Sequence, residues 1–403
     1  SAQDAPTILL GALTAGAKPV SGDPGNVTLV GRHERLPALG AALLNGTASH
    51  VLDFDDVNAR FLGHASVAVA GAALALGEQL DSSGADLVAA FVAGYETACR
   101  VAVAIGPQPY ARGWHYTGTA GTFGAAAACA RLLELDAERT AIAIGIAASE
   151  AAGLKCNIGT MTKSLHAGKA CENGLLAALL ASNGFTAAGD AIETEQGFAA
   201  LAGGECEAEA ALADPDAGWY LLDNLFKYHA SCYWTHSAIE GVLALRTEHG
   251  LVAGDVDSID LHVSDLELGT CVIPAPQTGL QVKFSIAQLA AMALLGRDLT
   301  VIADGDARDP EVVELRGRVR LVEDGVAGQP TRVVARRHDG TALEEAVGVN
   351  TPLRDLGAQR ARLQRKFMAL AEPVIGAEGA SSLSSCVAAL GSGPTVRELM
   401  ARA

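Results

Sequence analysis

The sequence has few aromatic residues and few charged ones. Aromatic side chains make up 4% of the 403 residues and charged side chains 19%, whereas half of the chain is hydrophobic and 45 residues are glycine. This composition excludes a disordered chain and a coiled coil, which both need abundant charge and little apolar content. Because alanine and glycine let helices approach closely, we expect a mainly helical body with a large packed core.

Positive charge is also scarce. The 29 lysines and arginines face 46 acidic residues, which gives a net charge of −17. Such a balance disfavours nucleic acid and anionic membrane surfaces as partners. No window reaches the ~18 uninterrupted apolar residues of a membrane span, and no signal-peptide pattern opens the chain. The eight cysteines stand singly, without CxxC pairs, as is typical of reduced thiols. We therefore expect a cytoplasmic protein.

Periodicity divides the chain into helical flanks and a mixed central part. Helical spacing predicts helices over 66–80, 86–105, 119–135, 137–152, 164–183 and 235–249, and again over 359–371, 380–390 and 396–403. Between them, residues 259–263 alternate like a strand, and Asp339-Gly340 predicts a hairpin. We expect a mainly α fold with a large all-helical domain built from both chain ends (1–254 and 351–403). A smaller α+β domain is inserted at 255–350.

Two segments carry histidines and acids among small apolar residues. Asp53-Phe54-Asp55-Asp56, followed by Gly63-His64, can bind a cation or cap a helix, although a solvated turn is the commoner role of such a run. His115, next to Trp114, suits a positioned acid or base near neutral pH, or a structural histidine bonded to backbone.

Two further segments add lysines and a cysteine. Thr162 or Ser164 can cap a helix whose first turn carries Lys163 and His166 on one face, either as a proton-transfer site or as an exposed turn. In the segment 227–236, Cys232 lies between two histidines, but no second ligand cluster completes a metal site. Together the four segments predict a basic pocket for a small polyanion. Such a pocket suits proton abstraction next to a carboxylate.

Taken in order, these segments resemble the MmgE/PrpD family, which includes 2-methylcitrate dehydratase, cis-aconitate decarboxylase and iminodisuccinate epimerase. The resemblance is carried by HVLDFDD and GHAS (50–66), GWHYTGTAGTFGAAAA (113–128), GTMTKSLHAGKACENGLLAALLA (159–181), FKYHASCYWTH (226–236) and PQTGLQVKFSIAQLAAMALLGR (276–297). It implies a helical domain with a smaller α+β lid, a homodimer, and chemistry without metal or cofactor. The implied partner is a small di- or tricarboxylate substrate.

The resemblance places His115 and Lys163 on catalytic positions, Asp53 and His64 in the pocket, and Lys227 on a lysine before the last active-site segment. We expect catalytic roles for His115, Lys163, His64 and Cys232, and substrate-binding roles for Asp53, His166, Lys227, Ser231 and His236. For His166, packing or support of the helix start is the alternative.

Three positions depart from the family pattern. Cys232 stands where the decarboxylase branch has a histidine, Val57 where it has a threonine, and Leu62 where the epimerase branch has an arginine. We predict a lyase that abstracts a C–H proton beside a carboxylate and completes dehydration, another elimination or decarboxylation. An epimerase of a small dicarboxylate and a non-catalytic carboxylate-binding protein are the alternatives.

Overall fold

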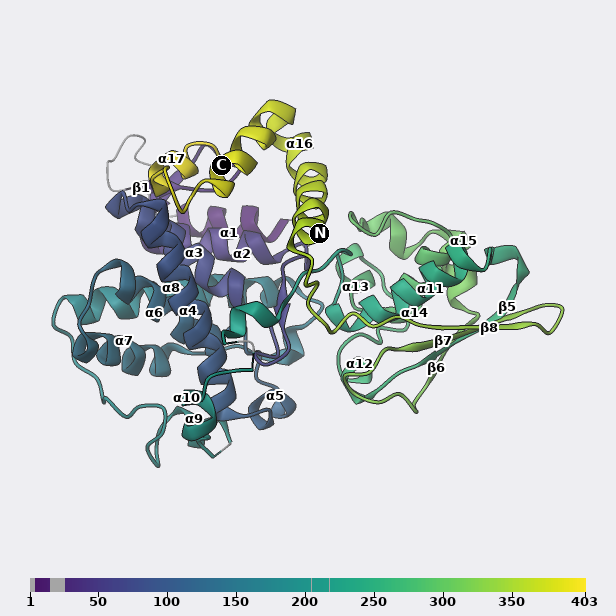
Figure 1. The fold of residues 1–403 in the computed structure, drawn as a ribbon, viewed down its shortest axis with the longest axis horizontal. Helices are drawn as coiled ribbons and strands as arrows, with labels where there is room; N and C mark the ends of the chain where they lie inside the picture. The colour runs from purple at the N-terminus through teal and green to yellow at the C-terminus, as the bar shows by residue number, and fades with distance from the viewer. Residues whose placement is uncertain (1–3, 15–25, 204, 217) are drawn as a thin grey trace.

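The structure is a computed structural model that describes residues 4–14, 26–203, 205–216 and 218–403. Its first part is a body of helices (Figure 1), namely α1 (Ala5–Thr14), α2 (Ala38–His50), α3 (Ala65–Leu80), α4 (Gly84–Ile105), α5 (Gln108–Arg112), α6 (Ala120–Leu132), α7 (Ala137–Glu150), α8 (Met161–Ser182), α9 (Phe198–Ala202) and α10 (Ala208–Leu212). Side-chain caps fix several starts: the Ser83 hydroxyl accepts from Asp86 N at α4, and the Thr160 hydroxyl accepts from Thr162 N at α8.

Glycines set the close helix crossings of this body. A Cβ at Gly94 of α4 would lie 2.6 Å from Gly124 O of α6, and one at Gly46 of α2 would lie 2.9 Å from Gly168 Cα of α8. Only glycine allows backbones to approach this closely. The shortage of large side chains in the sequence therefore appears in the structure as tight helix packing.

Helix α4 is long and apolar enough to cross a membrane by length and composition alone. However, 56% of its most apolar window is buried inside the protein. Its Glu96 carboxylate accepts a hydrogen bond from Leu221 N, and its Arg100 donates to Ala211 O. These contacts are those of a core helix in a folded body.

The second part is a four-stranded sheet with helices against it. Its strands β5 (Val256–His262), β6 (Val319–Val322), β7 (Arg332–Arg337) and β8 (Ala342–Ala346) are ordered β6-β5-β7-β8; only β5 and β6 are parallel. It is accompanied by α11 (His236–Glu248), α12 (Asp265–Leu268), α13 (Gly279–Val282), α14 (Ile286–Leu294) and α15 (Pro310–Arg316). Buried residues of α11 and α14 share one core with β5 and β7. Helix α11 thus belongs with the sheet, whereas the boundary expected at residue 255 left it in the helical domain.

The chain end returns to the helical body. Helix α16 (Leu356–Ala388) is kinked at Gly376, whose φ is +74°, and α17 (Val396–Met400) lies against α3. In Figure 1 these yellow helices lie beside the purple N-terminal ones. Five short 3₁₀ turns complete the described elements: η2 (Lys155–Asn157), η3 (Tyr220–Asp223), η4 (Tyr233–Thr235), η5 (Ala253–Asp255) and η6 (Asp304–Ala307).

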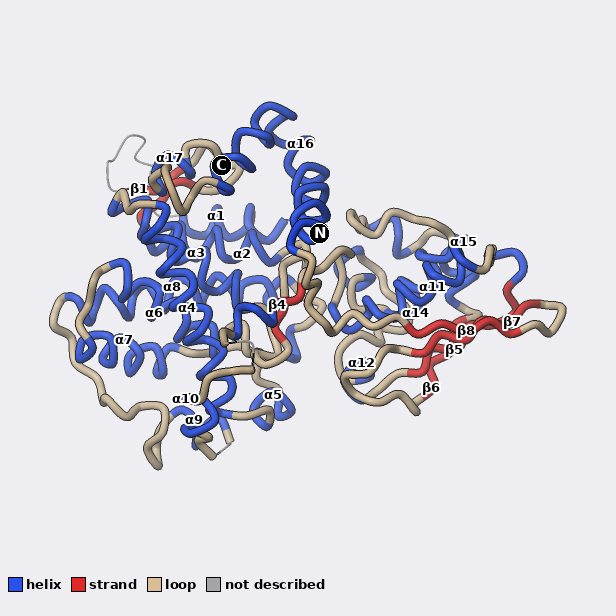
Figure 2. The backbone as a smooth tube through the Cα atoms, viewed as in Figure 1, coloured by secondary structure: helices blue, strands red, loops and turns tan. Residues whose placement is uncertain are grey.

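The expected fold class is wrong in its main description. The helical body is not all-helical, because it carries β1 (Asn26–Thr28) paired with β2 (Arg35–Pro37), and β3 (Val57–Asn58) paired with β4 (Asn224–Leu225). The chain is 56% helical and 10% strand, so it is a mixed fold with more helix than sheet. Strands of two or three residues are too short to show a period-two pattern, which is why the sequence did not reveal them. Figure 2 places the larger sheet at the end of the molecule away from α7, and the lid description is therefore not kept.

Candidate active site

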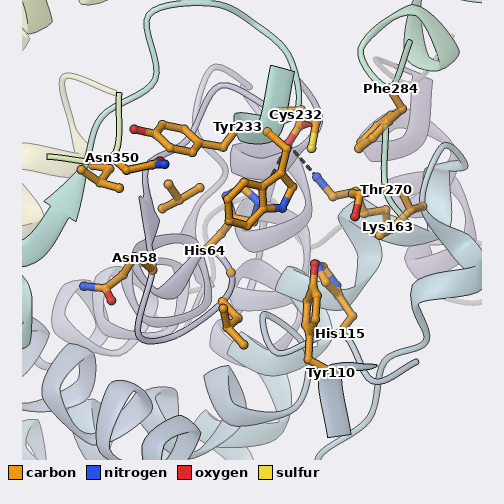
Figure 3. A pocket seen from close by; sticks show the side chains of 18 residues that line it. Asn58, His64, Tyr110, His115, Lys163, Cys232, Tyr233, Thr270, Phe284 and Asn350 are labelled. Carbon is orange, nitrogen blue, oxygen red and sulfur yellow. Dashed lines mark hydrogen bonds and ion pairs between the residues drawn. The ribbon is translucent and has the colours of Figure 1, made fainter. Parts of the chain in front are cut away.

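One pocket gathers residues from both parts of the molecule (Figure 3). The helical body contributes Asp53, His64, Tyr110, His115 and Lys163; the segment 225–234 contributes Leu225, Cys232, Tyr233 and Trp234; the second part contributes Thr270, Phe284 and Asn350. No lining residue comes from β5–β8. The four residues expected to be catalytic, His64, His115, Lys163 and Cys232, all line this pocket.

A buried carboxylate with two lysines forms the centre of the site. Asp53 Oδ1 accepts from Lys163 Nζ at 2.6 Å and from Lys227 Nζ at 2.9 Å, and Lys227 also donates to Asp53 O. Burial opposes ionisation of Asp53, but Lys163 and then Lys227 outweigh it and hold its pKa well below the usual value. Burial likewise opposes the charge of Lys227, yet Asp53 and Asp55 raise its pKa. The site thus holds a compensated ion cluster out of water.

Asp53 is placed by the loop after α2. Its φ of +50° lies in the left-handed region, which aspartate and asparagine tolerate better than most residues. Amines from distant segments hold the neighbouring carbonyls: Lys283 donates to Leu52 O, and Lys366 of α16 donates to Phe54 O at 2.5 Å. Burial lowers the pKa of each of these lysines to about 8. Together with Lys227, which donates to Asp53 O, lysines from three distant parts of the chain hold this left-handed turn in place.

A second carboxylate orients two histidines. Asp55 accepts from His50 Nδ1 at 2.9 Å, and its Oδ2 lies 2.8 Å from His64 Nδ1. The His64 Nδ1–H group donates to Asp56 O at 2.9 Å. Donation from Nδ1 leaves the opposite ring nitrogen of His64 to face Asp53 Oδ1, 4.0 Å away. His50 was not among the expected site residues; its position three residues before Asp53 was the signal in the sequence.

The acidic run is therefore not a solvated turn. Asp56, the third acid, accepts from Ser66 Oγ and from Asn224 Nδ2, each at 2.5 Å, and burial raises its pKa. Each carboxylate of the run has its own buried partner, and the turn interpretation that this segment favoured by itself is wrong. Three of the partners, Lys163, Asn224 and Lys227, come from distant segments, which local sequence could not indicate.

Within the described residues, one group has the spacing of a cation site. His50, Asp53, Asp55 and His64 each offer a ligand atom, and these atoms lie within 4.8 Å of one another. In the structure, the two lysines pair with Asp53 Oδ1, and His50 bonds Asp55. A cation at this place would compete with the two ammonium groups, although His50 Nε2 and Asp53 Oδ2 are buried without a hydrogen-bond partner.

His115 and His166 form a buried histidine pair. Their Nδ1 atoms lie 3.0 Å apart, so one ring donates and the other accepts. Burial and then Lys163 hold the pKa of His115 well below its usual value, and the same two causes lower that of His166 to about 4. Both rings are therefore neutral at neutral pH. Thr160, and not the expected Thr162 or Ser164, caps α8, which places Lys163 in its first turn.

Cys232 lines the pocket together with its neighbours Tyr233 and Trp234. A hydrogen bond from the Cys271 thiol lowers the pKa of Cys232, against the effects of burial and of Asp53. Of the expected substrate-binding residues, only Asp53 lines the pocket. His166 and Lys227 lie one layer behind it, in contact with His115 and Asp53, while Ser231 bonds Thr235. His236 stacks on Tyr233 and lines a neighbouring cavity.

Several pocket residues were not expected from the sequence. Tyr110, Thr270 and Asn350 contribute polar groups, and the Phe284 ring lies 5.1 Å from Lys163 Nζ. Phe284 lies within the last of the recognised motifs, residues 276–297, and this was its only sequence signal. The others lie in segments that carry no motif of their own.

Comparison with known proteins identifies the family of the chain. The MmgE/PrpD N-terminal domain model matches residues 4–210, and the MmgE/PrpD C-terminal domain model matches residues 229–391. A cis-aconitate decarboxylase of Aspergillus terreus is 26% identical, with 87% of this chain and 78% of that protein covered. The mouse and human cis-aconitate decarboxylases are 30% and 31% identical; the alignments cover 73% and 71% of this chain but only 63% and 62% of those proteins. These relatives support an enzyme of the lyase class, and the chain belongs to the MmgE/PrpD family.

Proposed function

We propose that this protein is a lyase that removes a C–H proton next to a carboxylate of a small di- or tricarboxylate. One observation carries the proposal: Lys163, His115 and His64 converge on one pocket, around a carboxylate that fixes the position of the lysine. The named relatives, which are cis-aconitate decarboxylases, support the substrate class.

In this mechanism the base is His115. Its neutral imidazole has a free electron pair for the C–H proton if Nδ1 donates to His166, which leaves Nε2 as the acceptor. The electron pair of the C–H bond moves into the adjacent carboxylate to give an enediolate. Lys163 stabilises the added charge, because its ammonium is held at the pocket by Asp53 before the reaction begins.

The second half of the reaction expels a group from the neighbouring carbon. The enediolate electrons re-form a carbon–carbon double bond as that group leaves with its bonding pair and takes up a proton. Cys232 lines the pocket, and its thiol can supply the proton for this step. We propose that no metal ion or organic cofactor takes part.

The test is proton NMR in D₂O with citrate, 2-methylcitrate, cis-aconitate and iminodisuccinate. We expect deuterium at the carbon next to a carboxylate, together with an alkene or decarboxylated product, and the same rates after treatment with a chelator. Exchange with inversion but without any leaving group would favour the epimerase. Saturable binding without exchange would favour the non-catalytic binder, and loss of activity on chelation would contradict the metal-free mechanism.

A matched pair of variants connects the test to the site. Lys163→Met removes the pocket ammonium, whereas Lys169→Met changes an exposed lysine on the same helix that pairs with Glu172. We expect exchange to be lost in the first variant and kept in the second. Equal exchange rates in both would contradict the role of Lys163.

A further inference from the structure

The candidate pocket has two chemically different ends. In Figure 3, Lys163, His115 and Thr270 lie on one side and Tyr233, Asn350 and Asn58 on the other. Of the 18 described residues that line the pocket, one is a lysine and none is an arginine. The single lysine belongs to the end where proton removal is proposed, so the two ends differ in charge.

The end away from Lys163 has an apolar wall. Val57 of β3 and Leu225 of β4 are direct cross-strand partners, and both are buried against the Tyr233 ring. Val349 packs against the same group. Val57, Leu225 and Tyr233 all line the pocket, and they present carbon atoms to a ligand there.

The polar groups at this end already bond to the protein backbone. The Asn58 amide donates to Tyr220 O at 2.8 Å, and its oxygen accepts from two backbone N–H groups. The Tyr233 hydroxyl donates to Val349 O, and the Asn350 amide donates to Gly328 O at 3.1 Å. A carboxylate placed at this end would lose its hydration and gain no cation, which is costly. An alkyl group would lose only its contact with water, which is favourable.

We propose that the natural substrate is a carboxylate bearing a branched alkyl substituent, which lies against Val57, Leu225 and Tyr233. The substrate's ionised end then faces Lys163, His115 and His64. This inference rests on the proposed function, since it assumes that the reacting carbon lies beside Lys163. It sets the expected substrate apart from a tricarboxylate, which would place a third charge at the apolar wall.

The test compares two substrates of matched shape. Citrate is malate with a carboxymethyl group on carbon 2, and 2-(2-methylpropyl)malate carries an isobutyl group of the same shape at that place. Both keep a hydroxyl group and a CH₂ next to a carboxylate, so both can undergo the same elimination. We expect kcat/KM to favour the isobutyl compound by at least ~100-fold, because pockets reject groups that leave buried charge unpaired.

Two variants locate the effect at the wall. Val57→Thr keeps the shape of the side chain and adds a hydroxyl group. We expect this variant to reduce the kcat/KM ratio of the isobutyl compound to citrate by about tenfold. Leu225→Arg supplies a cation at the wall, and we expect it to favour citrate over the isobutyl compound. Circular dichroism checks whether this variant folds. If it does not fold, Val57→Thr alone tests the wall.

The outcomes separate this inference from the proposed function. Exchange and elimination with citrate at equal or higher kcat/KM would overturn the apolar substrate and leave the lyase standing. An unchanged preference in folded Val57→Thr would also overturn it, because the discrimination would then arise elsewhere. Absence of deuterium exchange with both compounds and with 2-methylcitrate, cis-aconitate and iminodisuccinate would overturn the lyase and this inference together.

Discussion

Replacing Asp53 by asparagine tests the ion cluster at the centre of the pocket. Asparagine has the same shape and also tolerates the left-handed backbone at this position, so the change removes charge and little else. Lys227 would then be fully buried without a counter-ion, and Lys163 would lose its 2.6 Å partner. Breaking a buried pair from one side costs about 3–5 kcal/mol. We expect a loss of that size in the free energy of unfolding, measured by urea denaturation.

A second substitution isolates the charge effect. In Asp53→Asn/Lys227→Met the unpaired ammonium is gone, so the double variant should be at least ~1 kcal/mol more stable than additivity of the single variants predicts. Glu172→Gln, which breaks the half-exposed pair with Lys169, serves as the control and should cost less than ~1 kcal/mol. Additive single effects would refute the argument that Asp53 neutralises Lys227.

The same variant has a pH signature. Because the pKa of Asp53 lies well below 3.8 in the folded protein, its stabilising effect is complete above pH 3.8 and is lost as the pH falls through the folded value. The asparagine variant lacks this acid-dependent loss. A wild-type and variant stability difference that stays constant down to pH 2 would contradict the assignment.

Three further outcomes follow from the structure. Lys163→Met should lower kcat/KM by at least ~100-fold, with Lys169→Met close to wild type, in a steady-state assay of product formation. His115→Gln should lower kcat/KM by a similar factor. In the wild type, kcat/KM should rise with pH only well below pH 6.5, because burial lowers the pKa of His115. A rise centred at pH 6.5 would contradict the assignment of His115 as the base. Gly168→Ala should lower the free energy of unfolding, measured in urea, by about 1–3 kcal/mol, because a Cβ there would lie 2.2–2.3 Å from atoms of α2. Gly11→Ala, with open space around the new Cβ, should leave this free energy unchanged or raise it slightly.

Much of the secondary structure could be predicted from the sequence. The helix expected over 66–80 is α3 (Ala65–Leu80), and the hairpin expected around Asp339-Gly340 joins β7 to β8, with Gly340 at φ +89°. These elements are long or carry a strong turn signal, so local patterns suffice. The short pair β3–β4 joins residues 166 and 168 positions apart, and only tertiary packing brings the two strands together.

The sequence predicted which residues belong to the site, but not which of them line the pocket and which lie behind its wall. Motifs identified five side chains that line the pocket: Asp53, His64, His115, Lys163 and Cys232. They could not separate these from Lys227 and His166, which contact Asp53 and His115 from behind the pocket wall. Charge pairing also depends on the whole fold: Lys366 reaches Phe54 O across 312 residues. The homodimer, the cytoplasmic location and the absence of a cofactor stay predictions.

The small-residue composition and the chemistry of the pocket are connected through α2 and α8. Gly46 and Gly168 let these helices touch backbone to backbone, with Cys171 of α8 packed at the same crossing. Helix α2 ends at His50, just before Asp53, and α8 begins just before Lys163. Side chains larger than hydrogen at the crossing would push the two helices apart, and with them the residues of the 2.6 Å ion pair between Lys163 and Asp53. The glycines thereby hold the acid and the lysine at bonding distance, and an alanine at Gly168 should reduce catalysis as well as stability.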